Sequence, residues 1–437
     1  MIFSDKIFLI LGMARSGQAT AGWLKKKGAT VFTFDDNVLR NQANHGVKSI
    51  DEIPWTSLTA VIQSPGVPFS FPKPHPFTER AIANNVPILS DINLLREDQD
   101  KADFIGVTGT NGKSTTTALI GHILSQRSKN TAIGGNIGIP ALSLGKADAY
   151  VLELSSFHLE ISPPLDLDIG VWINISEDHL DRHGTMDAYV KAKENIFKNC
   201  KKAIIGIDDP FSAAVYEKIK NFLPVISVST KTEAAVWVSK GILYEGSKSI
   251  TDLNPILALK GIHNHQNAAI AYAAARHSGF SSSEIISALE SFPGLAHRLE
   301  IVKKSETILF VNDSKATNAD AAACALESYK DYSIYWIAGG RPKSQGIEPL
   351  SAYFSKIKHV FLIGEAQEQF SKTLHNSVSH FKCENIETAL SSALDKVNQE
   401  KRPNSVILFS PACASFDQFR DFEERGEVFK DLVGRMT

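Results

Sequence analysis

A glycine-rich segment that ends in lysine and hydroxyl residues is the most informative feature of this sequence. Residues 106–115 read Gly-Val-Thr-Gly-Thr-Asn-Gly-Lys-Ser-Thr, between an apolar run and a predicted helix. Backbone N–H groups that converge in such a turn bind phosphate, and the start of a helix adds positive potential. Lys113 could reach the β- and γ-phosphates of a nucleotide, and the Ser114 hydroxyl could bind Mg²⁺. The segment therefore predicts a P-loop.

The glycine spacing departs from the strict P-loop pattern. That pattern has a glycine five residues before Gly112, where this sequence has Val107. A glycine turn that binds no phosphate is the alternative, and the Gly-Lys-Ser-Thr run between a strand and a helix argues against it. Kinases, GTPases, motors and ligases all use a P-loop, so this motif alone does not identify a reaction.

Acidic, histidine and lysine residues follow two further apolar runs. Glu153 ends a predicted strand, at the edge of a parallel sheet where ligands bind, and could complete a Mg²⁺ shell begun by Ser114. Residues 174–183 contain two histidines and three acids that could hold metal, and a solvated charged loop is the alternative. Lys193 lies on the next predicted helix, where most lysines face solvent, so spacing alone does not single it out.

A second glycine turn follows the first predicted strand. Residues 12–17 read Gly-Met-Ala-Arg-Ser-Gly, and Asp35 ends the next strand, which is similar to a dinucleotide fingerprint. Ala14 replaces the middle glycine and adds a Cβ where a pyrophosphate would approach, so the signal for NAD is weak. A nicotinamide dehydrogenase is thereby disfavoured. Arg15 and Ser16 could instead contact an anionic or sugar-linked ligand, and a tight turn without a ligand is the alternative.

Three polar loops near the carboxyl terminus each follow a predicted strand. They are residues 312–318 (Asn-Asp-Ser-Lys-Ala-Thr-Asn), 339–343 (Gly-Gly-Arg-Pro-Lys) and 410–417 (Ser-Pro-Ala-Cys-Ala-Ser-Phe-Asp). Loops at one edge of a parallel sheet lie together, so they predict a binding face. Cys413 has small neighbours and no evident base, so we interpret it as a packing residue rather than a nucleophile.

Apolar runs alternate with helical segments throughout, which predicts parallel sheets covered on both faces and an α/β fold. We expect a Rossmann-like domain at 1–92, a P-loop ATPase-like domain at 93–296 and a second Rossmann-like domain at 297–437. The predicted strands are 7–11, 30–34, 60–63, 104–107, 149–154, 169–173, 203–207, 308–311, 334–338, 359–363 and 406–409.

Composition excludes several classes of protein. The chain has 437 residues and a net charge of −2, so it lacks the basic surface that general nucleic-acid binding requires. The four cysteines are scattered, which argues against disulfides and zinc and fits a reducing cytoplasm. No apolar run reaches about 18 residues, so we expect no membrane insertion.

These motifs together resemble the Mur ligase family, over essentially the whole chain. Residues 109–115 match that family's version of the P-loop, which accounts for the displaced glycine. The central matches are Glu153, 177–179 (Glu-Asp-His), His263, Asn264, Asn267 and 296–298 (Ala-His-Arg). Residues 312–318 and 410–419 are similar to the members that add D-glutamate.

The resemblance implies an ATP-dependent ligase of peptidoglycan precursor synthesis. It implies that D-glutamate is joined to UDP-N-acetylmuramoyl-L-alanine through an acyl phosphate, with release of ADP and phosphate, by a cytoplasmic monomer. The alternatives are another Mur-type ligase, folylpolyglutamate synthase or, in a different class, a P-loop ATPase switch.

The resemblance also implies site residues. Those for ATP are Gly109, Thr110, Asn111, Gly112, Lys113, Ser114, Thr115, Asn267, Arg298 and Asp313. Two Mg²⁺ ions would be held by Ser114, Glu153, His179 and Lys193, with Lys193 as a carbamate formed from CO₂. The implied catalytic set is Lys113, Glu153, His179, Lys193 and Lys315.

The implied substrate contacts fall into two groups. Those for the UDP-linked substrate are Arg15, Ser16, Asp35, Asp36, Asn37, Ser64, Pro65, Gly66, Asn136 and His179. Those for D-glutamate are Thr317, Lys343, Ser415 and Phe422. Asp36 and Asn37 depart from the family pattern, in which an arginine often follows the aspartate.

Overall fold

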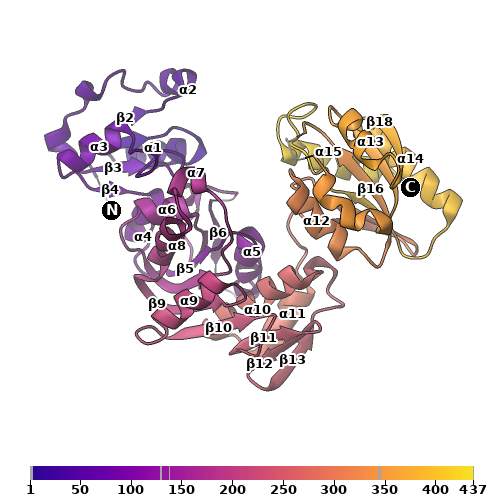
Figure 1. The fold of residues 1–437 in the computed structure, drawn as a ribbon. Helices are drawn as coiled ribbons and strands as arrows, with labels where there is room; N and C mark the ends of the chain where they lie inside the picture. Colours follow the sequence, from indigo (N-terminus) through magenta and orange to yellow (C-terminus); the bar gives the residue numbers. More distant parts are fainter. Residues whose placement is uncertain (1–2, 128–129, 137, 343–345, 437) are drawn as a thin grey trace. The chain divides into compact units, whose positions relative to one another are not determined.

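The computed structural model describes residues 3–127, 130–136, 138–342 and 346–436, and these form three β-sheets flanked by helices (Figure 1). The predicted α/β class is confirmed, and each predicted strand is present. The chain divides into two compact units, Met1–Pro255 with Ile262–Ser291 and Ile256–Gly261 with Phe292–Thr437. One sheet lies in each of the three predicted domains, and the domain boundaries themselves stay a prediction.

The first sheet is parallel and has the strand order β2-β1-β3-β4. Leu11 pairs with both Phe34 and Gln63, so the loops after β1, β2 and β3 leave the sheet at one edge. The elements are β1 (Ile7–Leu11), α1 (Arg15–Lys26), β2 (Thr30–Phe34), α2 (Val38–Ala43), β3 (Ala60–Gln63), α3 (Pro76–Ala83), β4 (Ile88–Leu89) and α4 (Asp91–Asp98).

The second sheet has the strand order β13-β12-β11-β10-β9-β8-β5-β7-β6, in which the β13–β12 and β12–β11 pairings are antiparallel. Its centre is buried on both faces because β5, β7 and β8 are apolar runs, as expected for a covered parallel sheet. Its strands are β5 (Asp103–Thr108), β6 (Thr131–Gly135), β7 (Ala149–Glu153), β8 (Asp166–Trp172), β9 (Asn199–Gly206), β10 (Val225–Ser229), β11 (Val236–Ser239), β12 (Ile242–Glu245) and β13 (Lys248–Asp252).

Helices cover this second sheet and share an apolar core with the first. The alanine-rich α10 is buried along most of its length and packs against α5. The helices are α5 (Lys113–Leu124), α6 (Ser156–Ile161), α7 (Leu180–His183), α8 (Met186–Glu194), α9 (Pro210–Ile219), α10 (Ile262–His277) and α11 (Ser282–Glu290).

The third sheet has the strand order β14-β15-β19-β16-β17-β18, in which only β14 is antiparallel to its neighbour among the described strands. Apolar clusters cover both of its faces. The elements are β14 (Glu300–Lys304), β15 (Ile308–Asn312), α12 (Ala319–Ser328), β16 (Ser333–Gly339), β17 (Ile357–Ile363), α13 (Gln367–Leu374), β18 (Ser379–Glu384), α14 (Ile386–Glu400), β19 (Ser405–Phe409) and α15 (Phe422–Arg435).

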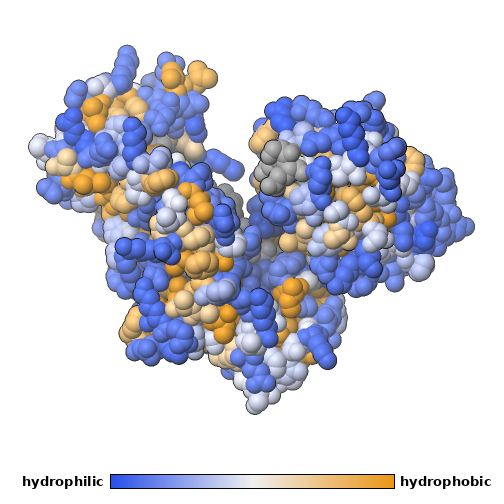
Figure 2. Space-filling view, in the orientation of Figure 1, coloured by the Kyte–Doolittle hydropathy of each residue, from blue (hydrophilic) through white to orange (hydrophobic). Residues whose placement is uncertain are grey.

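The two units differ in how many hydrophobic residues reach their surface. On the face shown in Figure 2, hydrophilic residues cover most of the second unit, while hydrophobic residues reach the surface of the first unit in patches. No helix in the described part of the chain is long and apolar enough to cross a membrane.

Candidate active site

The predicted P-loop connects β5 to α5. Gly112 precedes the helix with a φ of 84°, and a Cβ on it would lie 2.3 Å from Asn267 Oδ1, so this position requires glycine. No side chain caps the start of α5, which leaves its first N–H groups for an anion. The N–H groups of Thr110 and Asn111 donate to the backbone and side-chain oxygens of Asn174, which fix the loop against the end of β8.

Lys113 folds back over this loop. Its Nζ donates to the carbonyl oxygens of Gly109 at 3.0 Å and Thr110 at 2.7 Å. Ser114 is buried and Thr115 is half-buried on the first turn of α5. Asn267, from α10, is buried against Gly112, accepts from the Thr116 hydroxyl at 3.2 Å and so supports the loop from below.

Glu153 is the last residue of β7, which pairs with β5, the strand that precedes the P-loop. Its partner residue on β5 is Val107. Its carboxylate is 2% exposed, and Oε1 accepts from Asn136 Nδ2 at 3.1 Å. Among the described residues, no donor lies within hydrogen-bonding distance of Oε2, although that atom is buried. A buried carboxylate oxygen without a donor is costly. Glu153 therefore fits a role as ligand of a hard cation.

Lys193 is buried on α8, whereas Lys191 is exposed on the same helix. Its Nζ donates to Gly109 O at 2.8 Å and lies 3.4 Å from Thr108 Oγ1. Burial and the nearby positive charge of Lys113 hold the pKa of Lys193 well below its usual value, against the attraction of Asp178 and Glu153. The charged form of the amine beside the P-loop is therefore disfavoured.

The loop at 174–183 does not form a metal cluster by itself. In the described part of the chain, no group of three or more His, Cys, Asp and Glu side chains could hold a metal. His179 precedes α7 with a φ of 54°, is 45% exposed and lies 3.4 Å from Asp178. His183 faces inward, contacts the Ser156 hydroxyl at 2.9 Å and has a pKa lowered to about 4, chiefly by burial.

A cavity of about 470 Å³ opens beside the loops that follow β1, β2 and β3. It extends to the loop after β6, where Gly135 and Asn136 line it. Nine of the ten residues predicted for the UDP-linked substrate line this cavity, and His179 does not. The nine are Arg15, Ser16, Asp35, Asp36, Asn37, Ser64, Pro65, Gly66 and Asn136.

Asp35 organises one end of this cavity. Its carboxylate accepts from the backbone N–H groups of Met13 at 2.6 Å and Asn37 at 2.8 Å, and Arg40 Nε lies 3.4 Å away. Arg40, from α2, also lines the cavity, although the sequence analysis did not identify it. A cation thus lies beside Asp35. It comes from position 40, whereas in the family pattern an arginine often follows the aspartate directly.

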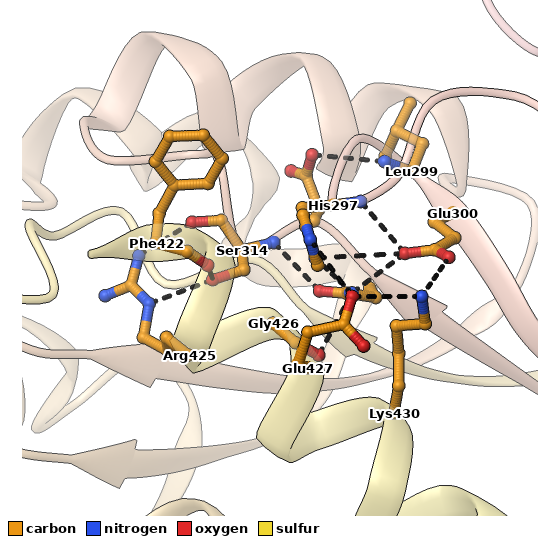
Figure 3. Close-up of polar contacts among 11 residues, drawn as sticks. His297, Leu299, Glu300, Ser314, Phe422, Arg425, Gly426, Glu427 and Lys430 are labelled. Atoms are coloured by element: carbon orange, nitrogen blue, oxygen red, sulfur yellow. Dashed lines mark hydrogen bonds and ion pairs between the residues drawn. The ribbon is translucent and has the colours of Figure 1, made fainter. Parts of the chain in front are cut away.

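In the second unit, a buried polar network connects the segment before β14, the loop after β15 and helix α15 (Figure 3). Asn312 Nδ2 lies 3.0 Å from both His297 Nδ1 and Glu300 Oε2. Lys430 forms ion pairs with Glu300 at 3.0 Å and Glu427 at 3.2 Å. The network fixes the start of the loop that carries Asp313, Lys315 and Thr317.

Arg425 secures two of the predicted loops. Its Nη2 donates to the carbonyl oxygen of Ser314 at 2.7 Å, and its Nε donates to Ser314 Oγ at 3.0 Å (Figure 3). The same Nη2 donates to the carbonyl oxygen of Cys413 at 3.0 Å. The side chain is 1% exposed, and burial lowers its pKa to about 10. Cys413 is buried, in agreement with a packing role.

The predicted residues of this unit lie around the same loops. Lys315 Nζ lies 5.1 Å from the centre of the Phe422 ring, and Ser415 is buried on the loop after β19. Asp313 accepts from Leu299 N–H at 3.2 Å and from the Ser410 hydroxyl at 2.7 Å, and burial raises its pKa to about 7. Lys343 lies outside the described residues.

Two family models match this chain. The Mur ligase middle domain matches residues 107–275, and the Mur ligase glutamate ligase domain matches residues 297–413. A UDP-N-acetylmuramoylalanine–D-glutamate ligase of Rhodospirillum rubrum is 42% identical over 98% of this chain and 94% of its own length. One from Caulobacter vibrioides is 41% identical over 100% of this chain and 97% of its own length.

The chain belongs to the Mur ligase family.

Solved Mur ligases share its fold. MurF from Acinetobacter baumannii has a TM-score of 0.64 at 19% identity, over 99% of this chain and 92% of its own. MurC from Thermotoga maritima has a TM-score of 0.61 at 18% identity, over 99% of this chain and 100% of its own. MurF from Thermotoga maritima, solved in complex with ADP, has a TM-score of 0.56 at 17% identity, over 83% of this chain and 92% of its own.

In this Mur ligase, the structure adds residues that the sequence did not indicate. Arg40 and His158 line the cavity, and Arg425 holds two loops of the second unit. A cation five residues beyond Asp35 and a histidine in the first turn of a short helix carry no local signal. Only Arg425 had one, because a charged residue in a segment otherwise patterned to pack inward indicates a buried partner.

Proposed function

We propose that this Mur ligase joins D-glutamate to UDP-N-acetylmuramoyl-L-alanine, with ATP as the energy source. The observation that carries the proposal is the 40–43% identity to ligases named for this reaction, over nearly the whole chain. The loops at 312–318 and 410–419, which resemble those of the D-glutamate-adding members, agree with it.

The chemistry requires activation of a carboxylate, which is a poor electrophile towards an amine in water. The carboxylate of the L-alanine residue attacks the γ-phosphorus of ATP, and ADP leaves. The resulting acyl phosphate is attacked by the neutral amine of D-glutamate. An amide bond forms, phosphate leaves with the electrons of the broken C–O bond, and the amine loses a proton.

The P-loop residues bind the triphosphate in this proposal. The uncapped start of α5 faces the phosphates, and the loop from Gly109 to Gly112 surrounds them. Lys113, which lies over the loop, exchanges its two carbonyl contacts for phosphate oxygens and offsets the charge that arises when two anions meet. Ser114 and Thr115 contribute hydroxyl groups, and Asn267, Arg298 and Asp313 complete the nucleotide contacts.

Two Mg²⁺ ions would be held by Ser114 and Glu153 and by His179 and Lys193, and would supply further charge neutralisation. The orphaned Glu153 Oε2 fits this role. Lys193 fits it as a carbamate, because its amine is buried with a pKa well below the usual value. A neutral amine adds to CO₂ with formation of an N–C bond and loss of a proton, which creates the oxygen ligands that Mg²⁺ prefers.

The cavity beside the first sheet binds the UDP-linked substrate in this proposal. Asp35, Asp36 and Asn37 lie at the uridine end together with Arg15 and Ser16. Ser64, Pro65 and Gly66 contact the diphosphate, and Asn136 and His179 contact the muramoyl part. Arg40, beside Asp35, is added to the uridine contacts.

In this proposal the third domain binds the amino acid. Thr317, Lys343, Ser415 and Phe422 bind D-glutamate, and Lys315 assists its reaction. Residues 1–92 bind the UDP-linked substrate, 93–296 bind ATP and 297–437 bind the amino acid. The protein acts as a cytoplasmic monomer without nucleic-acid partners.

The decisive experiment measures phosphate release by the purified protein with ATP, Mg²⁺ and UDP-N-acetylmuramoyl-L-alanine. We expect release to require D-glutamate, and a panel of other amino acids to be inactive. Turnover without any amino acid would indicate an ATPase switch, and preference for another amino acid would indicate a different ligase. A Lys113→Ala variant that ligates at the normal rate would contradict the role given to the P-loop.

Carbamylation of Lys193 is tested separately. Activity should fall when CO₂ and bicarbonate are removed and return when bicarbonate is added. A carbamate resonance should appear in the ¹³C NMR spectrum of the protein in ¹³C-bicarbonate and be absent from a Lys193→Met variant, while a Lys191→Met variant should retain it.

A further inference from the structure

At the start of α4, one oxygen of a second buried carboxylate lacks a hydrogen-bond partner among the described residues. Asp91 is 6% exposed, and its Oδ1 has no partner among the described residues. Burial of such an oxygen without a donor costs free energy, so its retention needs an explanation. His158 on α6 lies close to this oxygen, with its Nε2 3.9 Å from Asp91 Oδ1.

The imidazole of His158 is held on its other side. Its Nδ1 lies 2.8 Å from the hydroxyl oxygen of Ser155, the residue that caps α6. A carboxylate that faces Nε2 favours the tautomer with the proton on Nε2, so Nδ1 accepts the hydroxyl hydrogen of Ser155. At 3.9 Å the Nε2–H group is beyond hydrogen-bond distance from Asp91 and remains able to donate to another acceptor.

This pair lies beneath the loop proposed for the diphosphate. His158 lines the 470 Å³ cavity together with Ser64, Pro65 and Gly66. Asp91 lines a small neighbouring cavity with Ser16, Ser64 and Pro65. The two side chains therefore meet under the residues that would surround the phosphates.

Burial disfavours the charged form of both groups. It raises the pKa of Asp91 and lowers the pKa of His158, and each group opposes the shift of the other, with Glu153 also raising the pKa of His158. A neutral imidazole keeps one N–H group, so His158 can donate to an anionic ligand in either protonation state.

We propose that His158 donates a hydrogen bond to the diphosphate of the UDP-linked substrate, and that Asp91 is a positioning residue that holds the imidazole for this contact. The proposal rests on the function proposed above. It assigns a role to two buried groups that the ligation chemistry does not otherwise use.

The test compares Asp91→Asn and His158→Leu with the unaltered enzyme. Each should raise the KM for UDP-N-acetylmuramoyl-L-alanine about tenfold, as expected for loss of one hydrogen bond to a charged group. The kcat and the KM values for ATP and D-glutamate should stay within about twofold, because those ligands bind elsewhere. The double variant should be no worse than His158→Leu, since Asp91 acts through His158.

Asp98→Asn is the matched control, because Asp98 lies on the same helix in an ion pair with Lys27 at 2.5 Å and does not line the cavity. It should leave all KM values unchanged. Direct binding of UDP should weaken in both test variants, while binding of uridine should not. Thermal unfolding of each variant identifies any loss of folded protein, and His158→Leu carries the test if Asp91→Asn does not fold.

An unchanged KM in His158→Leu, or additive effects in the double variant, would overturn the inference. Weaker binding of uridine to the same degree as UDP would also overturn it, because the contact would then not be to the diphosphate. If the unaltered enzyme fails to ligate D-glutamate, the proposed function fails instead, and the binding of UDP still tests His158.

Discussion

At the scale of single residues, burial determines which chemically capable side chains form the site. Lys191 and Lys193 are two positions apart on α8, but only Lys193 is buried, with its amine 2.8 Å from the P-loop carbonyl of Gly109. Removal from water disfavours the charged form of such a group, and the same effect raises the pKa of buried acids. Reactivity at this scale therefore follows from position rather than residue type.

Asp313 gives a prediction at this scale. Its pKa is raised to about 7 because it is buried, so the folded state holds a proton that the unfolded state has lost between pH 4 and pH 7. Stability of the second unit should therefore fall as the pH rises through this window and level off above it. Asp313→Asn should remove this decline and be more stable than the unaltered protein at pH 8, by on the order of 2 kcal/mol.

Urea unfolding of the two proteins at pH 4.5, 6, 7 and 8 measures this effect. Asp331→Asn, at an exposed position of the same unit, is the control and should parallel the unaltered protein. Equal pH profiles for Asp313→Asn and the unaltered protein would show that the carboxyl group is ionised throughout the window.

At the scale of elements, the carboxyl ends of the parallel strands bring the site together. In the first two sheets the loops after β1, β3, β5, β6 and β7 carry the cavity, the P-loop and Glu153. In the third sheet the loops after β15 and β19 leave neighbouring strands, since Asn312 pairs with Phe409. Strand register thus places residues that are distant in the sequence at one edge.

The turn between β5 and α5 gives a prediction at this scale. Gly112→Ala would place a methyl group 2.3 Å from Asn267 Oδ1 at a φ of 84°, so we expect the loop to move and the KM for ATP to rise by about 100-fold or more. Gly22→Ala is the matched control. Gly22 is exposed on α1 with open space around it, so this change should leave the KM unchanged and stabilise the helix by about 0.5–1 kcal/mol.

Helix α15 gives a second prediction, through Arg425. Arg425→Lys keeps the charge but loses the planar group that contacts Ser314 and Cys413 together, so the two loops should loosen. We expect a loss of about 2–4 kcal/mol in stability and a raised KM for D-glutamate, with an unchanged KM for the UDP-linked substrate.

Arg435, exposed near the end of the same helix, provides the control for this change. Arg435→Lys should alter neither stability nor kinetics. If Arg425→Lys has a normal KM for D-glutamate despite reduced stability, the loops do not depend on this side chain for the pocket.

At the scale of the whole molecule, the chain consists of two compact units joined at three points. The joins follow Pro255, Gly261 and Ser291, and the short segment Ile256–Gly261 belongs to the second unit, where Lys260 lies 3.9 Å from the centre of the Tyr332 ring. Units with separate cores can unfold separately.

Calorimetry should therefore show two unfolding transitions. UDP-N-acetylmuramoyl-L-alanine at about 100 times its Kd should stabilise only the first unit, by about 2.7 kcal/mol. Tryptophan fluorescence identifies that transition, because Trp23, Trp55, Trp172 and Trp237 lie in the first unit and Trp336 in the second. One transition that coincides for all probes, and moves as a whole with this ligand, would contradict the prediction.

The α/β class, the P-loop and the family could be predicted from the sequence alone, because apolar strands, glycine turns and helix starts are local patterns. It did not indicate β11–β13, whose half-exposed edge strands lack a continuous apolar run. Only the family resemblance predicted that Arg15, Ser64 and Asn136 contact the same substrate. Their meeting in one cavity follows from the pairing of strands far apart in the chain.

Which polar groups are buried, and what they face, depends on the folded chain. The Oε2 atom of Glu153 and the Oδ1 atom of Asp91, which have no partner among the described residues, and the lowered pKa of Lys193 have no signature in sequence spacing. The cost of removing a charge from water, and the partner that offsets it, depend on neighbours that folding brings together.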